Sequence, residues 1–135
     1  MKQKYRDAFM QMAVIFGQTS EATRKKVGAL LVKDGAIISC GINGTPPGWP
    51  SEVCEGVDGL TLPHVRHAEV ACLSKGGLRK SDVKGSTMFV SLAPCYECSR
   101  KITTAGIKKV YFREQYRDNS GIAYLKENNV DVEQI

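Results

Sequence analysis

The chain has 135 residues, of which 42% are hydrophobic, and this is enough for one ordinary domain with a buried core and no disulfide staples. No run of about 18 apolar residues occurs, and charges interrupt the first 20 residues, so we expect a soluble, unexported, cytoplasmic protein without membrane contact. The net charge of +5 favours a polyanionic partner such as a nucleotide or a nucleic acid, but the basic residues are dispersed rather than gathered in a tail.

The first third of the chain predicts a helix followed by a hairpin. Residues 5–18 carry apolar side chains at spacings of three and four, which is typical of an amphipathic helix. The apolar runs 27–32 and 36–42 are separated by Lys33-Asp34-Gly35, in which Asp-Gly is a strong turn signal. We therefore expect two antiparallel strands.

Residues 43–66 predict a long irregular loop, since they hold four of the five prolines, several glycines and the only tryptophan. A loop of this length inside a compact domain is usually functional. Trp49 can serve there as a loop anchor, a subunit contact or a platform on which a base stacks.

Helices and strands alternate in the rest of the chain. This order predicts an α/β fold whose mixed sheet is parallel in its second half and has helices on both faces. We expect residues 1–135 to form a single domain. The expected elements are a helix over 67–75 ended by Gly76-Gly77, a strand over 87–93, a helix from 95 ended by Gly106, a strand over 108–114, a helix capped by Asp118 or Asn119 that runs to about 128, and a strand over 130–135.

Two short motifs carry the chemistry, His67-Ala68-Glu69 and Pro94-Cys95-Tyr96-Glu97-Cys98. One imidazole and two thiolates are ligands that zinc prefers, and three ligands leave the fourth tetrahedral position free for water, as in catalytic zinc sites. Each motif is predicted to open a helix, where the first-turn N–H groups favour thiolates.

Zinc lowers the pKa of a bound water toward neutrality, which supplies a nucleophile for C4 of a cytosine ring. Glu69 lies two residues after His67 and is free to carry protons from the water to ring N3 and to the departing amine. The combination of H-x-E with P-C-x-x-C is the known signature of zinc deaminases.

Other interpretations of these residues are weaker. Taken singly, the Cys-x-x-Cys pair could be a redox pair and His67 a core histidine. Editing of a base in a nucleic acid uses the same chemistry, but no basic and aromatic stripe suited to stacking bases is present, so a nucleic-acid partner is not expected. A zinc module that binds nucleotides without turnover would not need Glu69.

Beyond these motifs, the chain resembles the deoxycytidylate deaminase family from about residue 5 to its end. The segments GINGTPPGW, AGIKKVYF and Tyr116-Arg117-Asp118 match the family pattern, with Ile42 in place of the usual Tyr. The resemblance implies a three-layer αβα fold of the cytidine-deaminase type with a five-stranded mixed sheet. It implies zinc ligands His67, Cys95 and Cys98, with Glu69 as proton shuttle. The implied reaction is hydrolysis of dCMP to dUMP and ammonia, in the supply of precursors for dTTP.

The resemblance also implies a homohexamer that dCTP activates and dTTP inhibits, with Mg²⁺ assisting the binding of these effectors. The effector site would include Asn43, Gly44, Thr45 and Gly48. We expect the substrate to contact the following residues, among which Arg offers a planar fork suited to phosphate: Arg24, Asn43, His64, Ala68, Tyr116 and Arg117.

One departure from the family pattern is Ala71, which stands where relatives often carry Asn two residues after the catalytic Glu. Cys54 and His64 could contribute to a second, structural zinc site, although four ligands for it are not visible. We expect Cys40 and Cys72 to be small residues buried in a strand and in a helix.

Overall fold

The computed structural model describes residues 1–135, and it contains five helices and five strands. Every helix and strand expected from the sequence is present, within two residues at most ends. In chain order they are α1 (Gln3–Gly17), β1 (Gly28–Lys33), β2 (Ala36–Ile42), α2 (Ala68–Leu73), α3 (Lys80–Val83), β3 (Thr87–Leu92), α4 (Tyr96–Ala105), β4 (Lys109–Glu114), α5 (Ser120–Glu127) and β5 (Asp131–Gln134).

The strands form one five-stranded mixed sheet in the order β2-β1-β3-β4-β5. Strand β1 is antiparallel to β2 and to β3, whereas β3, β4 and β5 are parallel. The turn between β1 and β2 places Asp34 and Gly35 at φ values of 51° and 79°, the left-handed region that a tight hairpin requires. The predicted hairpin and the predicted parallel half of the sheet are both confirmed.

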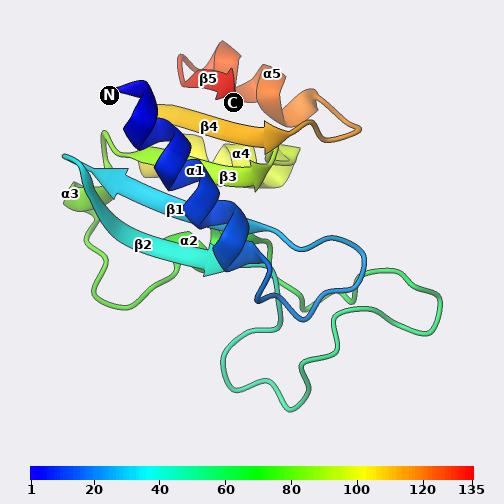
Figure 1. The fold of residues 1–135 in the computed structure, drawn as a ribbon. Coiled ribbons are helices and arrows are strands. Elements are labelled where there is room, and N and C mark those ends of the chain that lie inside the picture. Colours follow the sequence, from blue (N-terminus) through cyan, green and yellow to red (C-terminus); the bar gives the residue numbers. More distant parts are fainter.

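The sheet lies between two layers of helices, so the predicted three-layer αβα fold is confirmed. Helix α1 runs across one face, and α2 and α4 lie behind the other (Figure 1). Under α1, the buried side chains of Met10 and Ala13 pack on Leu30 and Phe89 of the sheet. The opposite face holds the larger cluster of 16 buried residues, because most of the other helices cover it.

Two details differ from the expected elements. Helix α2 ends at Leu73 rather than near 75, and the hydroxyl of Ser74 donates a hydrogen bond of 2.6 Å to the carbonyl of Val70. Such a bond satisfies a carbonyl at the helix end, so Gly76-Gly77 are not needed as the stop. The single turn α3 was not expected, because four residues carry too few apolar positions to show a period.

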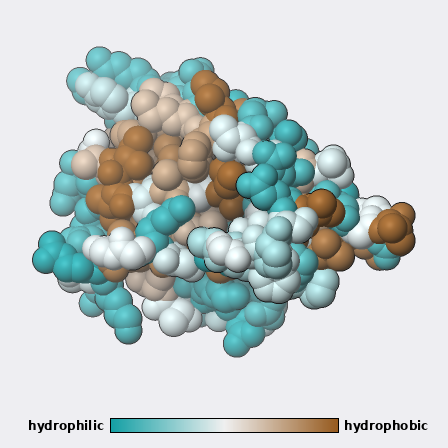
Figure 2. All heavy atoms as spheres, turned by 90° about the horizontal axis from the view of Figure 1, so that it is seen from below, coloured by the Kyte–Doolittle hydropathy of each residue, from teal (hydrophilic) through white to brown (hydrophobic).

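The segment 43–66 is irregular, as predicted, and bridges between Gly44 and Arg66 bring its two ends together. A second bridge joins Glu55 to Thr61. The loop leaves several large apolar side chains exposed, and Figure 2, which views the molecule from the side of this loop, shows apolar atoms at a protruding tip. These exposed side chains are Trp49, Val53, Val57 and Leu60.

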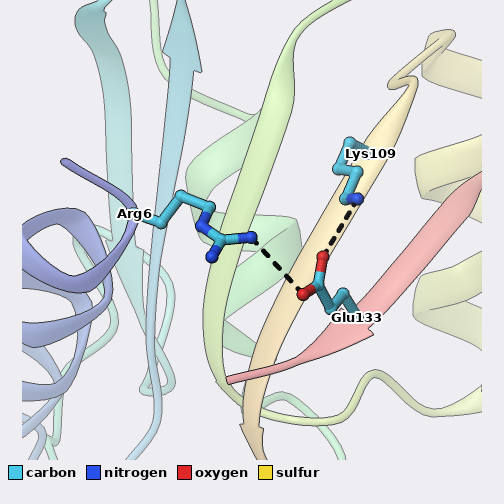
Figure 3. Close-up of polar contacts among 3 residues, drawn as sticks. All are labelled: Arg6, Lys109 and Glu133. Atoms are coloured by element: carbon cyan, nitrogen blue, oxygen red, sulfur yellow. Dashed lines mark hydrogen bonds and ion pairs between the residues drawn. The ribbon is translucent and has the colours of Figure 1, made fainter. Parts of the chain in front are cut away.

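An ionic bridge joins the beginning of the chain to its end. The carboxylate of Glu133 on β5 accepts a bond of 3.4 Å from Arg6 of α1 and one of 3.2 Å from Lys109 of β4 (Figure 3). It therefore ties helix α1 to the edge strand β5. None of the five helices has the length and the apolar character needed to cross a membrane.

Candidate active site

Three potential metal ligands meet where two helices begin. His67 is the residue that precedes the first turn of α2, and Cys95 holds the same place before α4, with Cys98 in the first turn of α4. The ligand atoms of these three residues all lie within 4.8 Å of one another. Nδ1 of His67 lies 3.3 Å from Sγ of Cys98 and 3.5 Å from Sγ of Cys95.

These distances fit a tetrahedral zinc ion. With a Zn–N bond of about 2.1 Å and a Zn–S bond of about 2.3 Å, two ligand atoms at the tetrahedral angle lie about 3.6 Å apart. The group is also open on one side, since His67 is exposed while Cys98 is buried. One imidazole, two thiols and an open side are the donor set of a catalytic rather than a closed zinc site.

Close packing against two glycines holds the helix starts in place. A Cβ atom on Gly41 of β2 would lie 2.4 Å from the amide nitrogen of Cys72, so only glycine lets α2 pack this close to the sheet. A Cβ atom on Gly121 of α5 would lie 2.2 Å from the carbonyl oxygen of Pro94. The backbone of Pro94 and Cys95 thus lies directly against the start of α5.

The protonation of the thiols also suits a cation. A hydrogen bond from Cys98, assisted by one from His67, lowers the pKa of the Cys95 thiol to about 4. The Cys95 thiolate in turn raises the pKa of Cys98 above its ordinary value. A metal dication held by Cys95 and Cys98 would displace the thiol proton, because coordination deprotonates thiols.

Glu69 lies in the first turn of α2, and its side chain is buried, with only 4% of the residue exposed. Burial raises the pKa of this carboxyl to about 7, although the charge of His67 opposes the shift. Glu69 lines the same cavity as His67 and Cys95. A carboxyl in this position is within reach of a molecule that occupies the metal's open side.

The cavity beside the metal ligands encloses about 240 Å³. It is lined by most of the residues that the sequence predicted to contact a substrate, and the structure therefore brings them together around one space. His64 is the exception: its ring stacks on Trp49 at 4.0 Å, and its Nε2 atom is buried without a partner. The predicted residues that line the cavity are Arg24, Asn43, Ala68, Tyr116 and Arg117.

Asn43 has a structural role that the sequence did not indicate. Its Oδ1 atom accepts a hydrogen bond of 2.9 Å from the amide of Val27, and its Nδ2 atom donates one of 2.7 Å to the carbonyl of Lys25. The side chain thus bridges two backbone groups of a segment that belongs to no helix or strand.

Glu55 binds the same segment nearer its start, and this role was not predicted from the sequence. Its carboxylate accepts hydrogen bonds of 2.9 to 3.2 Å from the amide and hydroxyl of Thr23 and from the amide of Arg24. Partial burial tends to raise the pKa of this carboxyl, but the hydrogen bonds from Thr23 and Arg24 together outweigh it and lower the pKa. No local pattern identifies Glu55, because its partners lie more than 30 residues away in the sequence.

A second cavity, of about 290 Å³, shares Asn43 and Cys54 with the first. Asn43, Gly44 and Thr45 line it, as does Arg66, whose Nε atom is buried without a partner. Gly48 does not line it and has a φ of 81° in the exposed part of the loop. Cys54 is buried between this cavity and the first, and neither Cys54 nor His64 belongs to a cluster of metal ligands.

A three-layer αβα fold with one imidazole and two thiols at two helix starts defines the class of cytidine-deaminase-like zinc proteins. The family model for the "Cytidine and deoxycytidylate deaminase zinc-binding region" matches residues 3–114. This match covers most of the chain and includes every predicted metal ligand. The chain belongs to the cytidine and deoxycytidylate deaminase family.

Individual relatives support this membership. Deoxycytidylate deaminase from Homo sapiens is 37% identical over 120 residues, which cover 82% of this chain and 66% of the human protein. The chain thus spans about two thirds of the length of that relative. Deoxycytidylate deaminase from Enterobacteria phage T4 is 28% identical over 151 residues, which cover 82% of this chain and 78% of the phage protein.

Among solved structures, the dCMP deaminase from cyanophage S-TIM5 in complex with dCMP and dUMP superimposes with a TM-score of 0.96. The two sequences are 43% identical, and the match covers 100% of this chain and 99% of the phage chain. Zinc is therefore the metal that the His67, Cys95 and Cys98 group accommodates by geometry and by family.

Proposed function

We propose that this chain hydrolyses dCMP to dUMP and ammonia. The observation that carries the proposal is one cavity lined both by the metal ligands His67 and Cys95 with Glu69 and by the cations Arg24 and Arg117. The first group suits attack on a cytosine ring, and the second suits a phosphate. The cyanophage protein, similar over its whole length, is a dCMP deaminase that was crystallised with dCMP and dUMP.

When bound, zinc supplies an activated water for addition to C4 of the ring. The side chain of Glu69 moves two protons: it takes one from the water and delivers it to ring N3, and it then takes the proton of the hydroxyl added at C4 and passes it to the leaving amine. Its burial among residues of α2 keeps bulk water from competing for these protons. The open side of the ligand group faces the cavity, so ring and carboxyl can meet there.

Arg24 and Arg117 are proposed to hold the 5′-phosphate, with a hydrogen bond from Tyr116. Neither arginine forms an ion pair with a carboxylate, so both guanidinium groups are free to bind an anion. Asn43 retains capacity for one more bond at each side-chain atom, which supports its proposed contact with the sugar. Ala68 would line the ring. A phosphate contact by His64 stays a prediction, since it requires the stack on Trp49 to open.

A substrate comparison tests the proposal. Initial rates of ammonia release would be measured with dCMP, CMP, deoxycytidine and a single-stranded oligonucleotide that contains cytosine. We expect dCMP to have the highest kcat/KM, and deoxycytidine to fall at least about 100-fold below it, since two cations would remain without their anion. If the oligonucleotide were the preferred substrate, the proposal of dCMP deamination would be wrong and nucleic-acid editing would take its place.

Regulation and assembly are further parts of the proposal. The cavity lined by Asn43, Gly44 and Thr45 would bind dCTP as activator or dTTP as inhibitor with Mg²⁺, and the unpartnered Arg66 is a cation available to a phosphate there. A homohexamer is the proposed assembly, and the exposed apolar side chains of the loop are available for its subunit contacts, because such patches mark protein interfaces. Light scattering would give the oligomeric state, and turnover of dCMP with each triphosphate would reveal regulation.

We also propose that residues 1–135 act as a single deaminase domain in the cytoplasm. All five cysteines are free, which suits a reducing compartment.

A further inference from the structure

A basic cleft of about 430 Å³ adjoins the substrate cavity. It lies between the end of α1, the irregular segment 23–26 and the ends of strands β3 and β4. Arg24 and Lys25 line both the cleft and the substrate cavity. The two spaces therefore meet at the segment that carries the proposed phosphate ligand Arg24.

The cleft contains more positive charge than the fold uses. Lys26 and Arg113 line it in addition to Arg24 and Lys25, and the only carboxylate in its wall is that of Glu114. Glu114 forms an ion pair with Lys25, and Lys26 forms no ion pair. Arg113 donates one hydrogen bond of 3.0 Å from Nε to an oxygen of Ile135, the last residue, and its two terminal nitrogens donate none.

A nucleoside monophosphate does not require these extra cations. A phosphate monoester carries about −1.5 to −2 charges at neutral pH, which Arg24 and Arg117 can match. Lys26 would remain unpaired next to the bound phosphate, and the two terminal nitrogens of Arg113 would remain without an acceptor. Additional phosphates, joined to the first by anhydride bonds, would extend past Arg24, and the adjoining cleft offers them room and charge.

We propose that this cleft binds the second and third phosphates of a cytosine deoxynucleotide, so that the chain also deaminates dCDP and dCTP. This inference rests on the proposed function, because it uses the same metal group and Glu69. The reaction at the ring is unchanged: a bond forms between C4 and a water oxygen, the bond from C4 to the amine breaks, and ammonia leaves. The phosphates keep their bonds, so the products are dUDP and dUTP.

A nucleic acid is a less suitable occupant of the cleft. Its wall contains no aromatic side chain on which a base could stack, and its polar lining includes Gln18, Thr23 and Ser91. A strand of nucleic acid would also have to continue from the 3′ oxygen of the target nucleotide. The cleft suits the short, highly charged phosphate chain of a single nucleotide.

The test measures initial rates with dCMP, dCDP or dCTP as the sole nucleotide, and chromatography identifies dUMP, dUDP or dUTP as the product. The variant Lys26→Ala/Arg113→Ala removes the surplus cations of the cleft. Lys108→Ala is the matched control, since Lys108 is exposed at the opposite end of β4. Because dCTP is also the proposed activator, the rate with dCDP alone shows whether a longer phosphate chain is accepted by the substrate site.

We expect wild-type protein to convert dCDP to dUDP with a kcat/KM within about tenfold of that for dCMP. The double variant should lose about tenfold on dCDP and more on dCTP, with less than about a threefold change on dCMP. Turnover of dCMP without formation of dUDP would overturn the inference and leave the proposed function standing. Equal losses on dCMP and dCDP in the double variant would also overturn it. Absence of turnover on dCMP itself would instead refute the proposed function.

Discussion

Two regions of the molecule meet at the cavity, and they are built in different ways. The metal ligands and Glu69 lie at the beginnings of α2 and α4, which pack on the sheet through close contacts at Gly41 and Gly121. The segment 23–27, which carries Arg24, belongs to no helix or strand. Its backbone is held by hydrogen bonds with the side chains of Asn43 and Glu55, both in the long loop: Asn43 donates to Lys25, and Glu55 accepts from Arg24.

The contrast assigns different tasks to the two regions. Proton transfer and metal binding need positions held to a fraction of an ångström, and helices packed on a sheet provide them. Binding of a charged phosphate tolerates more variation, and an irregular segment held by a few polar contacts is sufficient. Substitutions in the first region should therefore lower turnover of every cytosine substrate. Substitutions in the second region should affect only substrates that carry a phosphate.

The largest effect is expected from Cys98→Ser. Loss of one of three protein ligands should remove both the zinc, about one ion per chain in the wild type, and all measurable activity. Cys40→Ser is the matched control, since Cys40 is a free cysteine that lies in β2 and belongs to no ligand group. Elemental analysis and turnover of dCMP check both variants. Full activity in zinc-free protein would refute the assigned metal centre.

Arg117→Ala should have the next largest effect, and only on the phosphorylated substrate. A hydrogen bond to a charged group contributes about 1.5 to 3 kcal/mol, so kcat/KM for dCMP should fall about 10- to 100-fold. Residual activity on deoxycytidine should change little. Arg79→Ala removes an equally charged, exposed side chain just before α3 and should leave both substrates unaffected. Equal losses on dCMP and deoxycytidine would mean that Arg117 supports the fold.

Glu55→Gln tests whether the loop positions Arg24. The variant keeps one acceptor oxygen and loses part of the set of bonds to Thr23 and Arg24, so KM for dCMP should rise about three- to tenfold, with kcat nearly unchanged. Glu52→Gln is the control, because the carboxylate of Glu52 accepts no hydrogen bond. A lower KM would show instead that the charge of Glu55 repels the phosphate, and a fall in kcat would place Glu55 in the chemistry.

The smallest effect is expected far from both regions. Glu133→Gln removes the ion pairs with Arg6 and Lys109, but the carboxylate is 42% exposed and water screens it. The free energy of unfolding should fall by less than about 1 kcal/mol, with activity on dCMP unchanged. Urea denaturation measures the change, which should shrink at high salt. A loss of activity would mean that the ion pairs at the edge of the sheet contribute to function.

The two regions also differed in how well the sequence predicted them. The ligands His67, Cys95 and Cys98 lie in two short motifs at recognisable helix starts. Their spacing within the motifs and the order of the strands were enough to predict that they meet. Glu55 could not be predicted, since its role depends on contact with backbone groups 31 and 32 residues away. The stack of His64 on Trp49 was missed for a related reason: both lie in a loop whose course no periodicity describes.

The central claim is that the helix starts perform the chemistry while the irregular segment binds the phosphate. Its most direct test is Glu69→Gln, measured in three ways on one preparation. Elemental analysis should give about one zinc per chain, and equilibrium binding should give a Kd for dCMP close to the wild-type KM. Turnover of dCMP should drop by about 10²- to 10⁴-fold, the usual contribution of a positioned proton-transfer group. Retained zinc and retained binding with lost turnover would place the proton transfer at Glu69. Near-normal turnover in this variant would contradict the account.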